Sequence, residues 1–487
     1  MVRRFAAGLA VLTLFGCASA PSGGSAGTGS FAARSRLATP AAVPTTTAPT
    51  TAAPAAAPAA AAPAPAPAAS TCGTATSDSY QRPFAANAPW NVPVCGLSRS
   101  DRSDDWRDRF WYYARLNGHM ADNAALSTDR GTHDVLFGLD NDPAVDFSMA
   151  VYDARQATTQ IRVFQRQGWG GTMYPGNATT IPWNPSWKAS TGSDATMAIV
   201  DPTTGREWDL WGVVQSYPGI VANDTECWPW RAAFYLPGGG YVPGQDLCVG
   251  SANLVRNAGL TSTSDYRTYG GNNPAMRGVG IADSAMVVTP DEVSTGQIRH
   301  ALMMPVFNTM TGGTNCSEAQ AATPAFGVTC GGAVAPAGNF ERASSSSPGC
   351  GVAAAASLSA DGFRSTTVPE GSRFALRMSD GEIDVWLNSR GYAGAKRATA
   401  RAFAKALVDY GWFVTDTTCY GADFQVASGR NPVTAEKWRS LGITGDGRDL
   451  LAGLFTKDRI WTVAPPTNHC IDGHDSKLAC AANSITY

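Results

Sequence analysis

Two carboxylates and an indole alternate along one short stretch of the chain, and these side chains can do acid–base chemistry beside a sugar. Glu207, Asp209 and Trp211 stand at every second position after the turn-forming segment 201–205. Successive side chains of a strand point to opposite faces, so a strand here places all three on one face. Cleavage of a glycosidic bond needs a pair of carboxyl groups. The stretch predicts either a sugar-cleaving site or a hairpin with a wet polar face and core tryptophans.

Four further residues are candidates for the same site. His300 begins an apolar segment and offers a general base for hydrolysis or β-elimination, with a hydrogen-bonded core histidine as the alternative. Asp416 ends another apolar segment and is a further acidic candidate. Arg299 and Tyr420 would serve a lyase, which must neutralise a uronate carboxylate and move protons.

Tryptophan is concentrated in one part of the chain. Seven of the 14 tryptophans fall between positions 169 and 230. Aromatic faces pack against the C–H surfaces of sugars, and they also pack in protein cores. We expect Trp183, Trp187 and Trp211 to bind substrate, and a tryptophan-rich core is the alternative.

Metal and cofactor signatures are weak. The residues that crowd near the C-terminus match no zinc spacing; they are His469, Cys470, Asp472, His474 and Asp475. Loop 445–449 offers oxygen ligands for Ca²⁺, but it lacks the length and closing Glu of an EF-hand loop, and a plain turn is the favoured interpretation. The chain carries no serine nucleophile elbow, P-loop or dinucleotide fingerprint. We therefore expect no cofactor and no transition metal, with a structural Ca²⁺ as the one open alternative.

The N-terminal segments predict export. Residues 1–17 carry two arginines and then an apolar run too short for a permanent membrane span, and they end in a sequence that resembles a bacterial lipobox with Cys17 as its cysteine. Lipidation of Cys17 would place the protein on the cell envelope, whereas cleavage after Ala20 would release it. Residues 18–71 are rich in Ala, Pro, Thr, Ser and Gly, and they predict an extended tether without a packed core.

Cysteine content and charge agree with an exported protein. Of the 11 cysteines, ten remain if Cys17 holds lipid, an even number suited to five disulfides. Pairs of neighbouring cysteines are the economical prediction: Cys227 with Cys248, Cys316 with Cys330, and Cys470 with Cys480. The formal net charge of −2 gives no reason to expect nucleic acid or an acidic membrane surface as a partner. Membrane contact is expected through the lipid alone.

The remaining residues, 72–487, are predicted to form one mainly β domain. Short apolar runs rich in Val, Tyr and Trp, separated by Gly, Pro, Asn and Asp, occur from 135 to 306 and predict strands of an antiparallel sandwich or jelly roll. Helices are predicted over 103–118, with Ser103 as N-cap, and over 395–411, with Gly411 at the C-terminal cap. A further strand is expected at 412–417.

Several blocks resemble, in order, a large group of secreted bacterial proteins of mostly unassigned function. The blocks are VDPTTGREWDLWGV, RGVGIADSAMVVTPDEVSTGQIRHALMMPVFNT, VPEGSRFALR and ATARAFAKALVDYGWFVTDT. The resemblance implies a concanavalin-like β-jelly roll, the fold of many polysaccharide lyases, laminarinase-like glycosidases and lectins. Laminarinase-like enzymes carry a third acidic residue further along the strand, where this chain has Gly212. Either another residue supplies that acid or the chemistry differs.

Together these features predict an exported, disulfide-containing, monomeric protein that cleaves a polysaccharide in an aromatic-lined cleft. Glu207 and Asp209 would be the carboxylates, and His300 and Asp416 would assist them. A glycoside hydrolase is expected, or a lyase if the substrate is uronic. A carbohydrate-binding envelope lipoprotein without catalytic activity is the alternative.

Overall fold

The structure is a computed structural model, and its contacts divide the chain into Met1–Ala69 and Ser70–Tyr487. It describes residues 86, 88–114, 139–140, 148–165, 180–191, 195–204, 206–213, 246–249, 251–255, 285–307, 309–310, 316, 318–321, 323–337, 367–418, 423–444, 447 and 449–466. The predicted signal segment and tether lie outside these residues. Within the described residues, no helix has both the length and the apolar character needed to cross a membrane.

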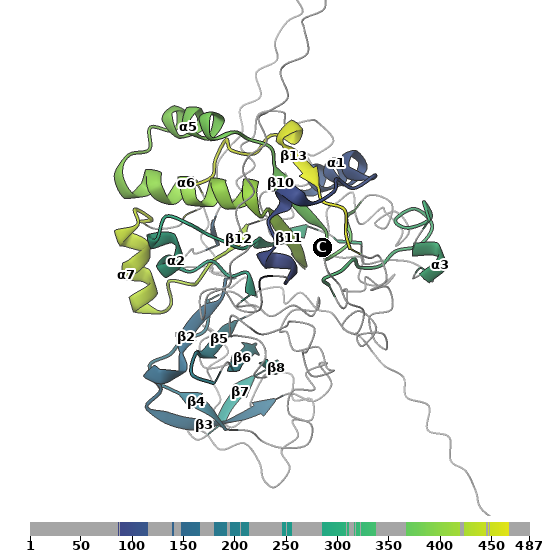
Figure 1. Ribbon diagram of the computed structural model, residues 1–487. Coiled ribbons are helices and arrows are strands. Elements are labelled where there is room, and N and C mark those ends of the chain that lie inside the picture. The colour runs from purple at the N-terminus through teal and green to yellow at the C-terminus, as the bar shows by residue number, and fades with distance from the viewer. Residues whose placement is uncertain are drawn as a thin grey trace, which may run out of the picture. The chain divides into compact units, whose positions relative to one another are not determined.

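One four-stranded sheet carries the predicted carboxylates. Its strand order is β2-β5-β6-β8 (Figure 1). The predicted hairpin is confirmed: β5 and β6 pair antiparallel, and the turn between them is held by the carboxylate of Asp201, which accepts hydrogen bonds from the backbone N–H groups of Thr203 and Thr204. The strands span Ala150–Asp153 (β2), Met197–Asp201 (β5), Arg206–Trp211 (β6) and Ser251–Val255 (β8).

A three-stranded sheet, β4-β3-β7, lies next to it in sequence and shares its core. These strands span Thr180–Trp183 (β4), Thr159–Gln165 (β3) and Asp246–Val249 (β7), and the one-turn helix η5 spans Ala154–Gln156. We call the shared core the tryptophan core. Its larger members are Tyr152, Ile161, Trp183, Trp187, Ile199, Trp208, Leu210 and Leu247.

The second four-stranded sheet has the order β13-β10-β11-β9, and helices α1 and α6 contact it (Figure 1). Aromatic side chains of α1 and the sheet pack closely: the ring centroids of Phe110 in α1 and Phe374 in β10 are 4.6 Å apart, and those of Phe374 and Trp412 are 5.8 Å apart. The elements span Leu302–Phe307 (β9), Arg373–Leu376 (β10), Trp412–Thr418 (β11), Ile460–Thr462 (β13), Ser103–Ala114 (α1), Asp380–Ser389 (α5) and Gly394–Asp409 (α6).

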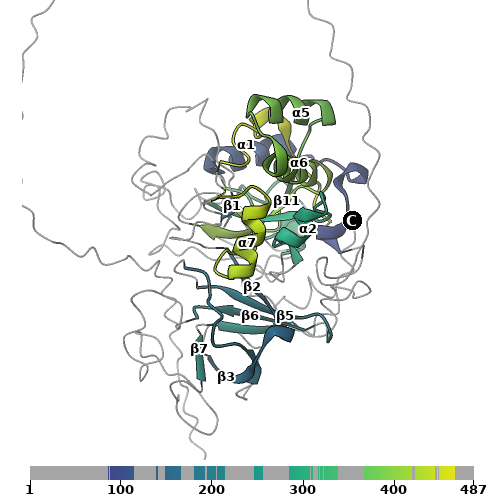
Figure 2. The same cartoon turned by 90° about the vertical axis from the view of Figure 1, so that its left-hand side faces the viewer.

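Short elements complete the described chain. Strands β1 and β12 pair in parallel, and α2 contacts both α6 and α7, at the side of the molecule that faces the viewer in Figure 2. These elements span Leu139–Asp140 (β1), Phe424–Gln425 (β12), Pro290–Ser294 (α2), Glu318–Ala321 (α3) and Pro432–Ser440 (α7). The one-turn helices span Pro89–Asn91 (η2), Val94–Gly96 (η3) and Lys457–Arg459 (η9).

The predicted class is found, with mixed strand pairing. The described chain consists of strands in small sheets with a few helices. The prediction was antiparallel, yet β1–β12, β2–β5, β3–β7 and β9–β11 pair in parallel. Parallel strands must be joined by a long connection. The sequence pattern of one strand does not show which distant strand will pair with it.

The two predicted helices are present. Helix α6 buries Phe403 and Leu407, as the apolar spacing predicted, and Gly411 follows its end with φ +70°. Helix α1 begins at Ser103, but the Ser103 hydroxyl accepts a hydrogen bond from the backbone N–H of Thr462 in β13 (2.9 Å), a tertiary contact where a cap had been predicted. The predicted end of α1, at 115–118, lies outside the described residues.

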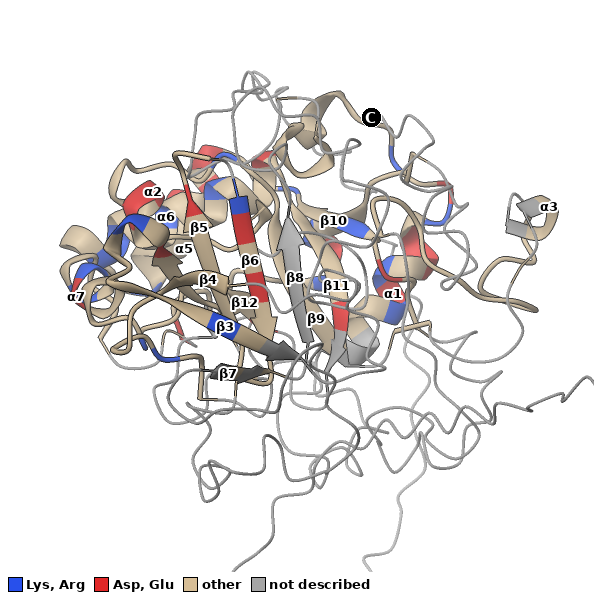
Figure 3. Ribbon diagram, turned by 90° about the horizontal axis from the view of Figure 1, so that it is seen from below, with Lys and Arg blue, Asp and Glu red and all other residues tan. Residues whose placement is uncertain are grey.

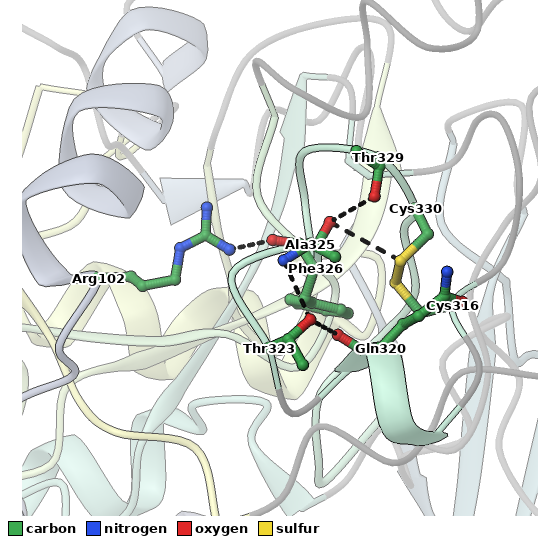
Figure 4. Close-up of a disulfide and its surroundings, with 8 residues drawn as sticks. All are labelled: Arg102, Cys316, Gln320, Thr323, Ala325, Phe326, Thr329 and Cys330. Atoms are coloured by element: carbon green, nitrogen blue, oxygen red, sulfur yellow. Dashed lines mark hydrogen bonds between the residues drawn. A yellow bond between two sulfur atoms is a disulfide. The ribbon is translucent and has the colours of Figure 1, made fainter.

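One of the three predicted disulfides is confirmed. Cys316 and Cys330 are bonded, and Arg102, just before α1, donates a hydrogen bond to the carbonyl of Phe326 inside the loop that they close (Figure 4). Arg109, on α1, donates to the carbonyl of Gly327 in the same loop (3.0 Å). Cys95 is disulfide-bonded as well. Cys227, Cys470 and Cys480, and the side chain of Cys248, lie outside the described residues.

The backbone after α6 requires a glycine. A Cβ atom on Gly411 would lie 2.0 Å from the carbonyl oxygen of Phe374, whereas a Cβ on Gly391, whose φ is +66°, would meet no atom within 4 Å. We expect Gly391→Ala to lower the free energy of unfolding by about 1–2 kcal/mol, the cost of the left-handed backbone. Gly411→Ala adds the clash to that cost and is expected to lose at least about 3 kcal/mol. Urea denaturation of both variants checks this, and equal losses would contradict it.

Candidate functional site

Glu207 and Asp209 lie side by side on one face of β6. In the antiparallel pair, Glu207 stands opposite Val200 and Asp209 opposite Ala198, so the four side chains share a face. Trp208 and Leu210 point to the other face, into the tryptophan core. The predicted alternation along this strand is therefore confirmed. Figure 3 shows the acidic positions of β6 in red.

The face with the carboxylates belongs to a second apolar cluster, which we call the central cluster. It contains Ala198 and Val200 of β5 together with Met303 of β9 and Phe413 of β11, so both four-stranded sheets contribute to it. Trp211 is partly buried and packs against it. The other large members are Trp90, Met149, Val151, Met286, Val287 and Tyr410.

Both carboxylates are fully buried. Glu207 and Asp209 each have 0% of their surface exposed. Burying a charged group costs several kcal/mol unless hydrogen bonds or an opposite charge compensate, and proteins accept this cost mainly at functional sites and in polar networks. The pair is therefore the strongest chemical feature on β6, and it lies against apolar neighbours that exclude water.

Asp416 faces the same cluster because of a β-bulge. Along β11, Phe413 pairs with Met303 and Val414 with Met304, but the register then shifts and Asp416 pairs with Pro305. Pro305 stands two residues after Met303, so it shares the Met303 face. Asp416 must share that face too, whereas an unbroken strand would have put it on the Val414 side. Its side chain is partly exposed.

His300 is buried and pairs with a carboxylate that the sequence analysis did not select. Its Nδ1 lies 2.8 Å from the carbonyl oxygen of Ala301, and its Nε2 lies 2.9 Å from Oε2 of Glu292 in α2. A carbonyl only accepts, so Nδ1 carries a proton, and a second proton must lie between Nε2 and the carboxylate. The His300 side chain is 1% exposed and that of Glu292 is 6% exposed.

The other oxygen of Glu292 caps α2. Its Oε1 accepts from the backbone N–H of Thr289 (2.6 Å), and the Thr289 hydroxyl accepts from the backbone N–H of Glu292, which makes a capping box. The sequence signal for this helix start was Thr-Pro-Asp-Glu at 289–292. Among the described residues, the hydrogen bonds of His300 go to Glu292 and Ala301, and none joins it to Glu207 or Asp209.

Two of the three tryptophans predicted to bind sugar are core residues. Trp183 and Trp187 are 2% and 4% exposed, and their rings meet edge to face with centroids 5.8 Å apart. Trp187 also stacks on Tyr152 (4.9 Å), and burial raises the pKa of Tyr152 to about 12, so its hydroxyl stays protonated and donates to the carbonyl of Lys188. A stacked sugar needs an exposed ring face, which these two rings lack.

The remaining candidates are spread out. Arg299 is partly exposed, and its Nε donates to the side chain of Gln297 (2.7 Å). Tyr420 and the residues 469–475 lie outside the described part of the chain, as do Gly445, Asp446 and Arg448 of the loop considered for Ca²⁺. In the part that is described, no three histidine, cysteine or acidic side chains come together as metal ligands do.

Comparisons with protein-family profiles, with curated proteins and with solved structures found no match to this chain.

Because Glu292 also pairs with His300, we expect the capping box of α2 to contribute more to the free energy of unfolding than the capping box of α5. Glu292→Ala removes both the cap and the partner of a buried histidine, and we expect the free energy of unfolding to fall by about 3–5 kcal/mol. Glu382→Ala removes the exposed capping box of α5, in which Ser379 is the N-cap, and we expect a loss of about 1 kcal/mol. Chemical denaturation measures both, and a Glu292 variant as stable as the Glu382 variant would contradict the assigned pairing.

The turn before β6 predicts a dependence on pH. Burial raises the pKa of Asp201, but hydrogen bonds from Thr204 and Thr203 outweigh it and hold the pKa below its ordinary value. A group whose pKa is lowered by folding stabilises the folded state above its unfolded pKa, about 3.9, and loses that effect as the pH falls through the folded pKa. Wild type is therefore expected to exceed Asp201→Asn in stability at pH 7, with the difference shrinking below about pH 4. Thermal unfolding from pH 7 to pH 3 tests this; a constant difference would refute it.

Proposed function

We propose that the protein is an exported enzyme that cleaves a polysaccharide, as a glycoside hydrolase or, on a uronic substrate, as a lyase. The observation that carries this proposal is the pair Glu207 and Asp209, buried together on one face of β6 with Trp211 as the next side chain on that face. Two carboxyl groups in a water-poor setting are what acid–base cleavage of an acetal requires.

Alternate positions on one strand bring the two carboxyl groups close together on the same face. Residues two apart in a strand have Cα atoms about 6.7 Å apart. Carboxyl groups are about 5–5.5 Å apart in retaining glycosidases and about 6.5–9.5 Å apart in inverting ones. In the proposed reaction one carboxyl group gives its proton to the departing glycosidic oxygen, and the other acts on water or on the anomeric carbon.

Strand β6 carries no acidic residue besides Glu207 and Asp209. The strand ends at Trp211, and Gly212 follows with φ +66°, so the chain turns away where laminarinase-like enzymes carry their third acid. Asp416, which the bulge of β11 turns toward the central cluster, is assigned to assist the pair. His300 is hydrogen-bonded to Glu292, and we assign it a structural role at the start of β9 in place of the catalytic role predicted from the sequence.

The remaining features of the proposal concern fold and location. The jelly-roll sandwich stays a prediction, supported by the contribution of both four-stranded sheets to the central cluster and opposed by the parallel pairs. Export, lipidation at Cys17, the tether of residues 18–71 and a monomeric state are proposed from the sequence. Because Glu207 and Asp209 are fully buried, binding of a glycan chain requires the residues over them to move.

The proposal predicts that Glu207→Gln and Asp209→Asn abolish turnover with almost no change in melting temperature, since each amide keeps the shape of the acid but not its chemistry. The purified protein is incubated with neutral and uronic polysaccharides, and reducing ends and unsaturated products are measured. Reducing ends alone indicate a hydrolase, and both products indicate a lyase.

Glu436→Gln, an exposed substitution on α7, is the matched control and should leave turnover unchanged. Full turnover in the Glu207 and Asp209 variants, together with a large loss of stability, would refute the catalytic assignment. Binding of a polysaccharide by the wild type without cleavage would instead favour the carbohydrate-binding alternative.

A further inference from the structure

The bulge of β11 brings two consecutive polar side chains to one face. Phe413 faces the central cluster, and alternation places Thr415 on the same side of β11. Thr415 is the residue left unpaired between Val414 and Asp416, and Asp416 pairs with Pro305 on that same face. In a regular strand neighbouring side chains point to opposite sides. The hydroxyl of Thr415 and the carboxylate of Asp416 therefore share a face only because of the bulge.

The Thr415 hydroxyl is buried without a hydrogen bond. Thr415 is 1% exposed, and its Oγ1 has no hydrogen-bond partner in the described structure. Leaving a buried hydroxyl unsatisfied costs about 1–3 kcal/mol, and valine would fill the same space without that cost. Other buried threonines have partners: the Thr399 hydroxyl donates to the carbonyl of Leu441 (2.8 Å), and that of Thr196 to the carbonyl of Ser148 (2.7 Å).

We propose that Thr415 and Asp416 form a binding element for hydroxyl groups of a glycan chain. This inference rests on the proposed function and extends it to the residues that hold the substrate. A threonine hydroxyl both donates and accepts, and a carboxylate accepts from two hydroxyls, which suits neighbouring hydroxyl groups of a sugar ring. The carboxylate of Asp416 disfavours an anionic ligand at this position. Its partial exposure places the element at the border between the buried cluster and solvent.

The test compares Thr415→Val, which removes the hydroxyl, with Thr415→Ser, which keeps it. Turnover and binding are measured on the same polysaccharide panel, and melting temperatures are recorded for each full-length variant. We expect Thr415→Val to bind or cleave about 10-fold less well, a loss of about one hydrogen bond to the ligand, with Thr415→Ser close to wild type. The melting temperature of Thr415→Val should equal or exceed that of wild type. Thr399→Val, the control, should melt lower because its hydroxyl has a partner in the protein.

Two results would overturn the inference: wild-type turnover and binding in Thr415→Val, or a melting temperature lowered as in Thr399→Val, which would show that the protein itself satisfies the hydroxyl. If wild type binds a glycan without cleaving it, the proposed enzyme activity fails and the binding element is judged on affinity alone. If wild type neither binds nor cleaves any polysaccharide of the panel, both proposals are overturned.

Discussion

The guanidinium of Arg373 joins segments of the chain that are far apart in sequence. It is 1% exposed, its Nε and Nη2 donate to the carbonyl of Tyr410 at the end of α6, and its Nη1 and Nη2 donate to the carbonyls of Pro89 and Val92. It also lies over the ring of Phe413, 5.1 Å from the centroid. A planar group with five donors can satisfy several carbonyls at once, which lysine cannot do. The segment before α1, strand β10 and the connection from α6 to β11 are thereby fixed to one another.

The segment before α1 that Arg373 contacts is also hydrogen-bonded to the backbone next to His300. The carbonyl of Trp90 accepts from the backbone N–H of Ala301, whose own carbonyl faces Nδ1 of His300. Glu292 then connects this histidine to the first turn of α2. A buried polar network of this kind is costly unless every member is satisfied, and when satisfied it fixes one arrangement of the surrounding backbone. The network lies at the start of β9. Strand β9 is also the parallel partner of β11, and the bulge of β11 lies opposite it.

Local patterns predicted local structure well and tertiary contacts less well. The hairpin of β5 and β6, helix α6 and the Cys316–Cys330 bond follow from turn residues, apolar spacing and closeness in sequence, and each is present. The partner of His300 is eight residues away, on a helix whose capping box the sequence contains but which was not recognised. Trp183 and Trp187 have the residue type of a sugar platform, but burial in a shared core decides their role, and composition alone does not encode burial.

The first and last described segments of the folded unit are hydrogen-bonded to each other. Ser100 donates from its backbone to the carbonyl of Thr462, Ala464 donates to the carbonyl of Ser98, and Arg99 forms a β-bridge with Val463. These contacts join residues more than 350 positions apart, so they form only after almost the whole chain has been synthesised. Closing so long a loop is slow, and until it closes β13 cannot complete its sheet. The segment before α1 therefore emerges from the ribosome early, but it gains its partners in and beside β13 only when the chain is nearly complete.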